Sequence, residues 1–329
     1  MTAGLKKIEV YQMAKKRTLG VEFQFFVVFF FIIFVLSGCV TVDKGYKIDG
    51  VENTAETQIS SKLDEELFSK KLPAMTADEY EMMGDSLLSK GNLHMAFLQY
   101  ERSLQCNPRN IRVEYKKGLT LLAGKNSDDA IKQFNIVLLM NPGHAAAYEG
   151  LGRAFFQKKN YKGAEQHFRK ALELDPSLWK SRNFLGNIYD YQAKYEKAIR
   201  EYKNALALKP KSGVLYNNLG VSYSLAGKHL KAVDAFNKAL SVKYTKSKVY
   251  NNLGLALANL GRYSEALESF KKSGGEARAY NNLGCIYLSK GMIKEAVQCF
   301  EKAIEIDPIF YVKAGENLNR AKMSLENRQ

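Results

Sequence analysis

Cysteine and histidine supply most protein nucleophiles and metal ligands, and this chain of 329 residues contains four of each. No HExxH pair, paired cysteine ligands, phosphate-binding glycine loop or serine elbow occurs in the sequence. We therefore expect a non-enzymatic protein without metal or cofactor. The histidines are expected at the surface, at positions His94, His144, His167 and His229. Three cysteines occupy unrelated positions in the repeat described below and are expected to be buried thiols, namely Cys106, Cys285 and Cys299.

The fourth cysteine, Cys39, ends an amino-terminal segment with the layout of an export signal. Five basic residues precede an apolar run over residues 25–36, and Leu36-Ser37-Gly38-Cys39 follows the run. A basic region, a short apolar core and small residues before a cleavage site are typical of a secretory signal. The segment resembles the bacterial lipoprotein signal, in which this tetrapeptide is the lipobox.

That resemblance implies a diacylglyceryl thioether on Cys39, removal of residues 1–38 and acylation of the new amino group. Two or more acyl chains anchor a protein stably to a membrane. Val40 stands where lipoproteins of the inner membrane typically carry Asp, which favours the periplasmic face of the outer membrane. A transmembrane helix is the alternative, because residues 25–42 are 18 uncharged residues and just long enough to span a bilayer. Met13 is an alternative start to Met1.

Asparagine pairs recur further along the chain, and their regular spacing indicates that a repeated structural unit positions them. Each pair stands directly before Leu-Gly, and the Leu-Gly dipeptides at 151–152, 185–186, 219–220 and 253–254 advance by 34 residues each time. Self-similarity at a fixed period of this size predicts a solenoid.

Each unit reads as two antiparallel helices. With glycine numbered as position 8, the small residues at positions 8 and 20 stand where the helices must approach closely, and an aromatic residue at position 24 fills the space beside them. Apolar residues fall at helical spacing, as in Tyr216, Leu219 and Tyr223. Proline at position 32 ends the second helix. The pattern resembles the tetratricopeptide repeat (TPR) family, which implies an all-α TPR α-solenoid, a right-handed superhelix of helix-turn-helix repeats.

The repeat register divides the chain into consecutive parts. Residues 1–38 are the expected signal peptide, and residues 39–76 are a lipidated tether with an amino-terminal capping helix. Seven TPR units cover 77–310, at 77–110, 111–144, 145–178, 179–212, 213–246, 247–276 and 277–310. The sixth is shortened by four residues and carries two glycines, so we expect a shorter second helix there. An apolar stripe over 311–329 predicts a carboxy-terminal capping helix.

A surface remains as the candidate site. In TPR proteins the first helix of each unit lines a groove, so the family implies that positions 2, 5, 6, 9, 12 and 13 variously reach it. Amides offer donors and an acceptor and can pair with the backbone of an extended peptide; they occur at Asn183, Asn187, Asn217, Asn218, Asn251, Asn252, Asn281 and Asn282. A basic edge at position 2 suits acidic groups, with Arg112, Lys180, Lys248 and Arg278. Equally, one asparagine of each pair could tie adjacent repeats together.

Charge narrows the class of partner. The formal net charge is +15, and it falls to +12 when residues 1–38, with five basic and two acidic residues, are removed. A basic body suits an acidic partner, peptidoglycan or an anionic membrane face, although lysines also simply coat solvated helices. No dense basic cluster with interleaved aromatic residues occurs, so we expect no nucleic acid and no small-molecule substrate as partners.

The lipobox, the successive Asn-Asn-Leu-Gly units and the junction over residues 274–284 together resemble TadD, the assembly lipoprotein family of the tight-adherence (Tad/Flp) pilus. The resemblance implies a membrane-anchored scaffold of the bacterial envelope that binds protein partners during pilus or secretion-system assembly. An adaptor for peptidoglycan-modifying enzymes and a type IV pilus pilotin are the alternatives. The sequence does not identify the partner, because a fold does not specify function.

Overall fold

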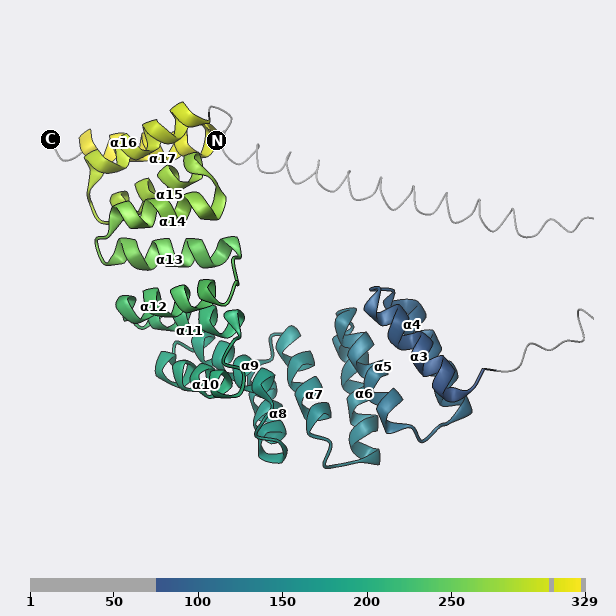
Figure 1. Ribbon diagram of the computed structural model, residues 1–329. Helices are drawn as coiled ribbons and strands as arrows, with labels where there is room; N and C mark the ends of the chain where they lie inside the picture. The colour runs from purple at the N-terminus through teal and green to yellow at the C-terminus, as the bar shows by residue number, and fades with distance from the viewer. Residues whose placement is uncertain (1–74, 308–310, 327–329) are drawn as a thin grey trace, which may run out of the picture. The chain divides into compact units, whose positions relative to one another are not determined.

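The computed structural model describes residues 75–307 and 311–326, and within them the chain is entirely helical. The predicted signal peptide, Cys39 and the predicted tether helix lie outside the described residues. Fifteen described helices follow one another, coloured in chain order in Figure 1. None of these helices is both long enough and apolar enough to cross a membrane.

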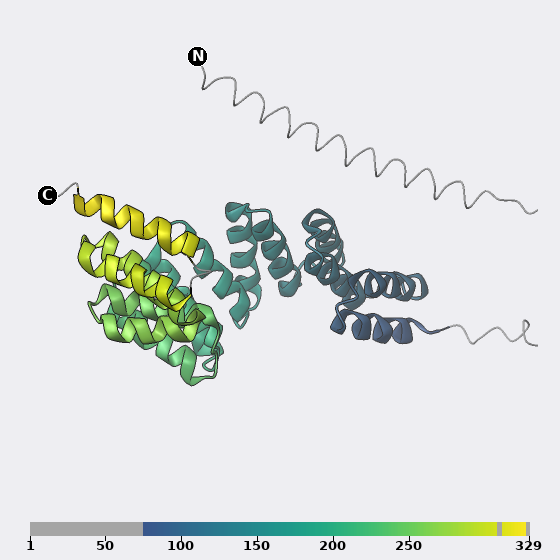
Figure 2. The same cartoon turned by 90° about the horizontal axis from the view of Figure 1, so that it is seen from above.

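Fourteen of the helices form seven consecutive pairs. The first helices are α3 (Ala77–Ser89), α5 (Ile111–Ala123), α7 (Ala145–Gln157), α9 (Trp179–Tyr191), α11 (Gly213–Leu225), α13 (Ser247–Asn259) and α15 (Glu276–Ser289). The second helices are α4 (Leu93–Cys106), α6 (Ser127–Met140), α8 (Tyr161–Leu174), α10 (Tyr195–Leu208), α12 (His229–Ser241), α14 (Tyr263–Gly274) and α16 (Ile293–Ile306). The last helix, α17 (Tyr311–Glu326), packs on α16 at the carboxy-terminal end (Figure 1 and Figure 2).

Each helix packs on its neighbours in the chain, and first helices of adjacent repeats also touch, as α5 touches α7 and α11 touches α13. A solenoid is stabilised by such nearest-neighbour contacts, because one helix pair cannot bury its apolar face alone. The predicted TPR solenoid is therefore confirmed as the fold class.

The glycine at position 8 permits the closest approach inside each repeat. A Cβ atom built on Gly220 would lie 2.6 Å from Cε1 of Phe236, whose side chain is completely buried. The same contact recurs in every repeat, between the glycine of the first helix and the aromatic ring of the second. All seven rings are fully buried: Tyr100, Phe134, Phe168, Tyr202, Phe236, Phe270 and Phe300. In each repeat the core thus contains one buried ring that packs against the backbone of a glycine.

Local interactions set the helix ends. The Thr76 hydroxyl accepts the backbone N–H of Glu79, and the Glu79 carboxylate accepts the backbone N–H of Thr76, which is a capping box. In the sixth repeat, α14 has 12 residues where most second helices have 14. Only Gly275, with φ of 86°, separates α14 from α15. Glycine adopts this left-handed geometry without strain, which allows a linker of one residue. The four residues that the sixth repeat lacks are therefore missing partly from α14 and partly from the linker that follows it.

Candidate functional site

The asparagines of the first helices form one continuous set of contacts between repeats. Each position-6 amide N–H donates to the position-5 amide oxygen of the preceding repeat. The bonds are Asn218 to Asn183 at 2.9 Å, Asn252 to Asn217 at 3.3 Å and Asn282 to Asn251 at 3.4 Å. Asn317 of α17 continues the series by donating to Asn281 at 2.9 Å. We call these five helices and their amide bonds the asparagine ladder.

Two of the ladder amides, both at position 5, are buried. Asn217 and Asn281 are only 3% exposed, whereas the position-6 amides Asn218, Asn252 and Asn282 are half-buried. The Asn217 N–H also donates to Asn218 at 3.2 Å. The other two position-5 amides, Asn183 and Asn251, are half-buried like those at position 6. The amide oxygens of Asn252 and Asn282 accept no hydrogen bond from the described residues.

An ion-pair network occupies the equivalent place at the start of the array. Lys116 of α5, at position 6, donates to Glu81 of α3 at 2.7 Å and to Asp85 at 2.6 Å. Arg112 adds a bond of 2.7 Å to Glu81. Burial alone would raise the pKa of Glu81, but hydrogen bonds from Arg112 and Lys116 outweigh it and lower that pKa. The same inter-repeat link is thus ionic between α3 and α5 and neutral from α9 onward.

Aromatic side chains replace the amides between the third and fourth repeats. Phe184, at position 6 of α9, stacks on Phe168 with ring centroids 5.1 Å apart and packs edge-on against Phe156 at 5.3 Å. Tyr191 stacks on Tyr161 at 4.9 Å and remains 69% exposed. This cluster is not among the residues predicted from the sequence. Aromatic residues at positions 6, 12 and 13 of first helices were the signal that could have found it.

Asn187, predicted to reach the groove, is engaged inside its own repeat. The Tyr202 hydroxyl donates to Asn187 at 2.6 Å and to Asp190 at 3.0 Å. The buried Ser222 hydroxyl of the next repeat donates to Asp190 at 2.5 Å. Burial raises the pKa of Asp190, and the two hydroxyl donors only partly offset that effect. This cluster holds α9, α10 and α11 together.

The position-2 cations do not form one uniform edge. Arg112 is bound to Glu81 and lies 3.8 Å from Asp78. Lys180 and Lys248 are exposed and lie over the rings of Trp179 and Tyr244, each at 5.8 Å. Arg278 is also exposed, and its side chain runs beside Gly274. Lys180, Lys248 and Arg278 form no ion pair with any described residue.

Two expectations about cysteine and histidine are wrong. Cys106 and Cys285 are exposed, and only Cys299 is buried, which raises its pKa to about 11. Position 30 and position 9 lie on solvated sides of the repeat. Of the histidines, only His94 is exposed. His144 caps α7, and His167 stacks on Phe155 at 5.0 Å, where burial lowers its pKa. No cluster of metal-binding side chains occurs within 75–307 and 314–324.

Comparison with protein families assigns the class. Models of the tetratricopeptide repeat match residues 115–178, 214–245, 247–273 and 277–310, and a model described as TPR repeat matches residues 186–227. The matches at 214–245, 247–273 and 277–310 each cover one of the helix pairs described above. The chain belongs to the tetratricopeptide-repeat proteins, whose arrays mediate protein–protein interactions. No curated protein sequence matches the chain.

Solved structures share the fold. Pseudomonas aeruginosa PilF is 23% identical, with a TM-score of 0.50 over 64% of this chain and 98% of PilF. PilW, a type IV pilus biogenesis factor, is 20% identical, with a TM-score of 0.54 over 59% of this chain and 90% of PilW. A chain of the APC/C hetero-tetramer Cut9–Hcn1 is similar in fold at 21% identity and a TM-score of 0.54, over 80% of this chain and 51% of that one.

Proposed function

We propose that this protein is a membrane-anchored TPR scaffold of the bacterial envelope. Its first-helix face, from α9 to α15, binds an extended segment of a partner protein during assembly of a pilus or secretion system of the tight-adherence (Tad/Flp) type. The anchor is the acylated Cys39, at the periplasmic face of the outer membrane. The protein is a scaffold and carries out no reaction of its own.

The observation that carries the binding proposal is a pairing of amides with exposed apolar side chains on successive first helices. Leu225 of α11 is 51% exposed and Leu255 of α13 is 41% exposed. Leu225 lies two turns beyond Asn218, and Leu255 lies one turn beyond Asn252, so each shares a helix face with a half-buried amide. Amides suit the backbone of an extended segment, and apolar side chains suit its residues.

The envelope and pilus parts of the proposal rest on different support. The lipobox resemblance at residues 36–39 supports the anchor. The likeness to PilW, a type IV pilus biogenesis factor, supports a role in pilus assembly. That likeness also favours a second candidate, a type IV pilus pilotin. Neighbouring genes for a tight-adherence pilin and ATPase, or for a type IV pilus, would separate the two candidates.

A double variant tests the first-helix face. Leu225→Glu with Leu255→Glu places two charges where the partner's apolar residues would sit. The control is Leu139→Glu with Leu230→Glu, because these leucines are 85% and 69% exposed but belong to the second helices α6 and α12. In a strain lacking the native copy, the first variant should abolish surface pilin in sheared fractions, and the control should restore it. Full piliation with both variants would refute binding at this face.

A further inference from the structure

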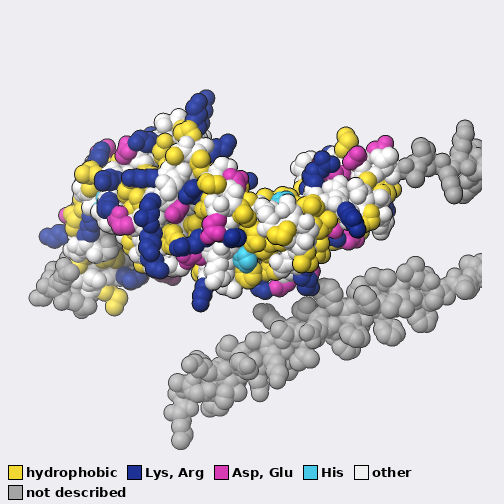
Figure 3. Space-filling view, turned by 90° about the horizontal axis from the view of Figure 1, so that it is seen from below, with side chains coloured by type: hydrophobic (Ala, Val, Ile, Leu, Met, Phe, Trp, Pro, Cys, Tyr) yellow, Lys and Arg dark blue, Asp and Glu magenta, His cyan; other side chains and the backbone are white. Residues whose placement is uncertain are grey.

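Positive charge is concentrated in two of the seven repeats. Residues 179–246 contain 13 Lys and Arg against four Asp and Glu, a formal charge of +9. All residues from 75 onward contain 39 against 25, a formal charge of +14, so these two repeats carry most of the excess. Figure 3 shows Lys and Arg side chains gathered over the part of the molecule where α9 to α12 lie. Attraction of anions is therefore strongest there.

Most of this charge is not compensated inside the protein. Only Arg182, Lys228 and Lys238 of the 13 form ion pairs with described residues. Lys197 and Arg200 of α10 are exposed and form no ion pair or side-chain hydrogen bond with any described residue.

Lys197 and Arg200 line a recess between the second helices α8 and α10, floored by α9. Its volume is about 380 Å³, and Arg169 and Arg182 complete a set of four cations. Two carboxylates, Glu173 and Glu201, also line it. The cations therefore outnumber the carboxylates by two. We call this the α8–α10 recess.

The carboxylates present do not satisfy the guanidinium of Arg182. One of its terminal nitrogens reaches Glu201 at 3.5 Å, and the other donates to the Pro176 carbonyl at 3.3 Å. Its Nε–H is buried and has no partner among the described residues. A buried donor left unpaired is costly. Arg169, by contrast, is held by Glu165 at 2.8 Å and by the Tyr189 hydroxyl at 2.9 Å.

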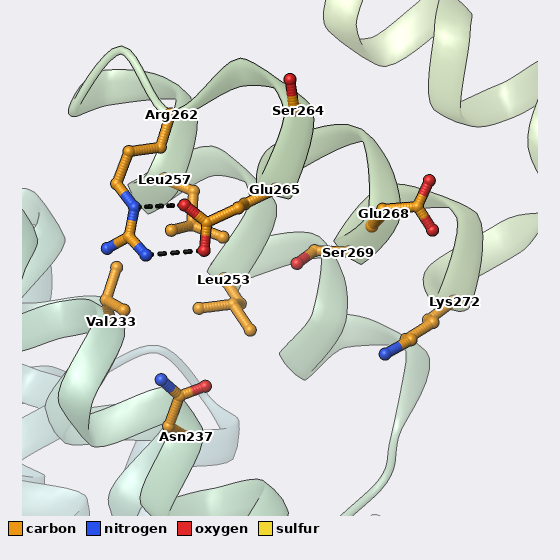
Figure 4. A pocket seen from close by; sticks show the side chains of 10 residues that line it. All are labelled: Val233, Asn237, Leu253, Leu257, Arg262, Ser264, Glu265, Glu268, Ser269 and Lys272. Carbon is orange, nitrogen blue, oxygen red and sulfur yellow. Dashed lines mark hydrogen bonds and ion pairs between the residues drawn. The ribbon is translucent and has the colours of Figure 1, made fainter.

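The equivalent recess two repeats further on provides an internal comparison. It lies between α12 and α14, has a volume of about 370 Å³ and is drawn in Figure 4. Leu253 floors it as Leu185 floors the first, 68 positions earlier. There Glu265 and Glu268 stand at the positions of Lys197 and Arg200. Arg262 is locked to Glu265 by two hydrogen bonds of 2.6 Å. The recess recurs in the array, but the α12–α14 recess lacks the excess of cations over carboxylates that lines the α8–α10 recess.

We propose that the α8–α10 recess binds a carboxylate-bearing segment of a partner protein, at a surface separate from the first-helix face. Arginine pairs with carboxylates through two parallel hydrogen bonds, and such charge-assisted bonds are strong. Leu185 and Tyr189 on the floor add apolar contact for the segment's other side chains. The volume is at the lower end of the ~300–1,000 Å³ typical of ligand pockets, which suits one or two peptide side chains.

The test uses a fluorescein-labelled peptide Glu-Glu-Leu-Glu-Glu and its neutral counterpart Gln-Gln-Leu-Gln-Gln, with binding followed by fluorescence anisotropy. Lys197→Gln with Arg200→Gln removes two recess charges while keeping long side chains. Lys243→Gln with Lys246→Gln is the control. Both lysines are exposed and lie in the α12–α13 linker, and replacing them removes the same amount of charge. The recess variant should bind the acidic peptide about tenfold more weakly than the control.

Three results would overturn the proposal. Equal weakening in both variants would mean attraction by net charge alone. Equal binding of the acidic and neutral peptides would exclude a carboxylate ligand. Competition by inorganic phosphate, or selective loss of binding to phosphatidylglycerol vesicles with peptide binding unchanged, would assign the recess to a phosphate group. Thermal melts that overlay for the two variants confirm that neither loses its fold, since neither pair has a structural partner.

Discussion

Replacing Asn217, Asn251 and Asn281 together by Ala tests whether the asparagine ladder holds the repeats together. The variant loses three inter-repeat hydrogen bonds, of 3.3, 3.4 and 2.9 Å, and the 3.2 Å bond from Asn217 to Asn218. Bonds at or beyond the upper end of the usual N–H···O range contribute least, so we assign ~0.5 kcal/mol to each longer bond and ~1.5 kcal/mol to the shortest. The expected loss is about 3 kcal/mol.

Helix propensity would hide part of this loss, because alanine stabilises a helix interior by roughly 0.5 kcal/mol per residue relative to asparagine. The matched control is therefore Asn135→Ala with Asn204→Ala and Asn237→Ala. These three asparagines are exposed in second helices and form no side-chain hydrogen bond with described residues, so they gain the same propensity and lose nothing.

The ladder variant should melt about 6–12 °C below the control, since ~1 kcal/mol corresponds to roughly 2–4 °C for a domain of this size. Far-UV circular dichroism measures both melting temperatures, and comparing the two variants cancels the gain in helix propensity. Coincident melting curves would refute the reasoning. The amides would then add nothing to stability and would be available to a partner.

Three further predictions concern the core, the anchor and the ion-pair network. Gly220→Ala should lower Tm, because overpacking costs ~1–3 kcal/mol of stability. The double variant Gly220→Ala with Phe236→Leu should lower Tm by less than the sum of the two single variants; additive shifts would mean that the contact between residues 220 and 236 is not the cause. Cys39→Ala should leave an uncleaved, unacylated precursor by mass spectrometry, and an intact chain with unmodified Cys39 in the parent would exclude the lipoprotein proposal. Glu81→Gln should lower Tm at neutral pH, and the difference should shrink as pH falls from the ordinary glutamate pKa of 4.5 through the lower folded-state pKa, where Glu81 is protonated in both states; a difference independent of pH would exclude the ion pairs.

The sequence predicted the helix pairs because their cause is local and repeated. Glycine at position 8 and the ring at position 24 meet inside one unit, so one register suffices to place both Gly220 and Phe236. The capping box at Thr76 and Glu79 is equally local. Helix class and close approach follow from spacing alone.

The candidate site was harder to predict because its contacts join different repeats. Asn217 and Asn218 are adjacent in sequence, yet one is buried and the other is half-buried, since each step along a helix rotates the side chain by about 100°. Whether an amide bonds to a neighbour or a partner depends on the spacing between repeats, which a single unit does not encode. The aromatic cluster around Phe184 and the α8–α10 recess likewise combine residues of two repeats.

The two proposed surfaces have complementary chemistry. Neutral amides of the asparagine ladder can pair with the backbone of many extended segments, so they confer little selectivity among partners. The α8–α10 recess selects for negative charge, because its four cations face two carboxylates. Arg182 and Asn183 are consecutive residues of α9 and place the two surfaces on the same helix. A partner that engages both surfaces would gain affinity from the ladder face and selectivity from the recess. Once one surface is bound, binding at the other is intramolecular and occurs at a high effective concentration.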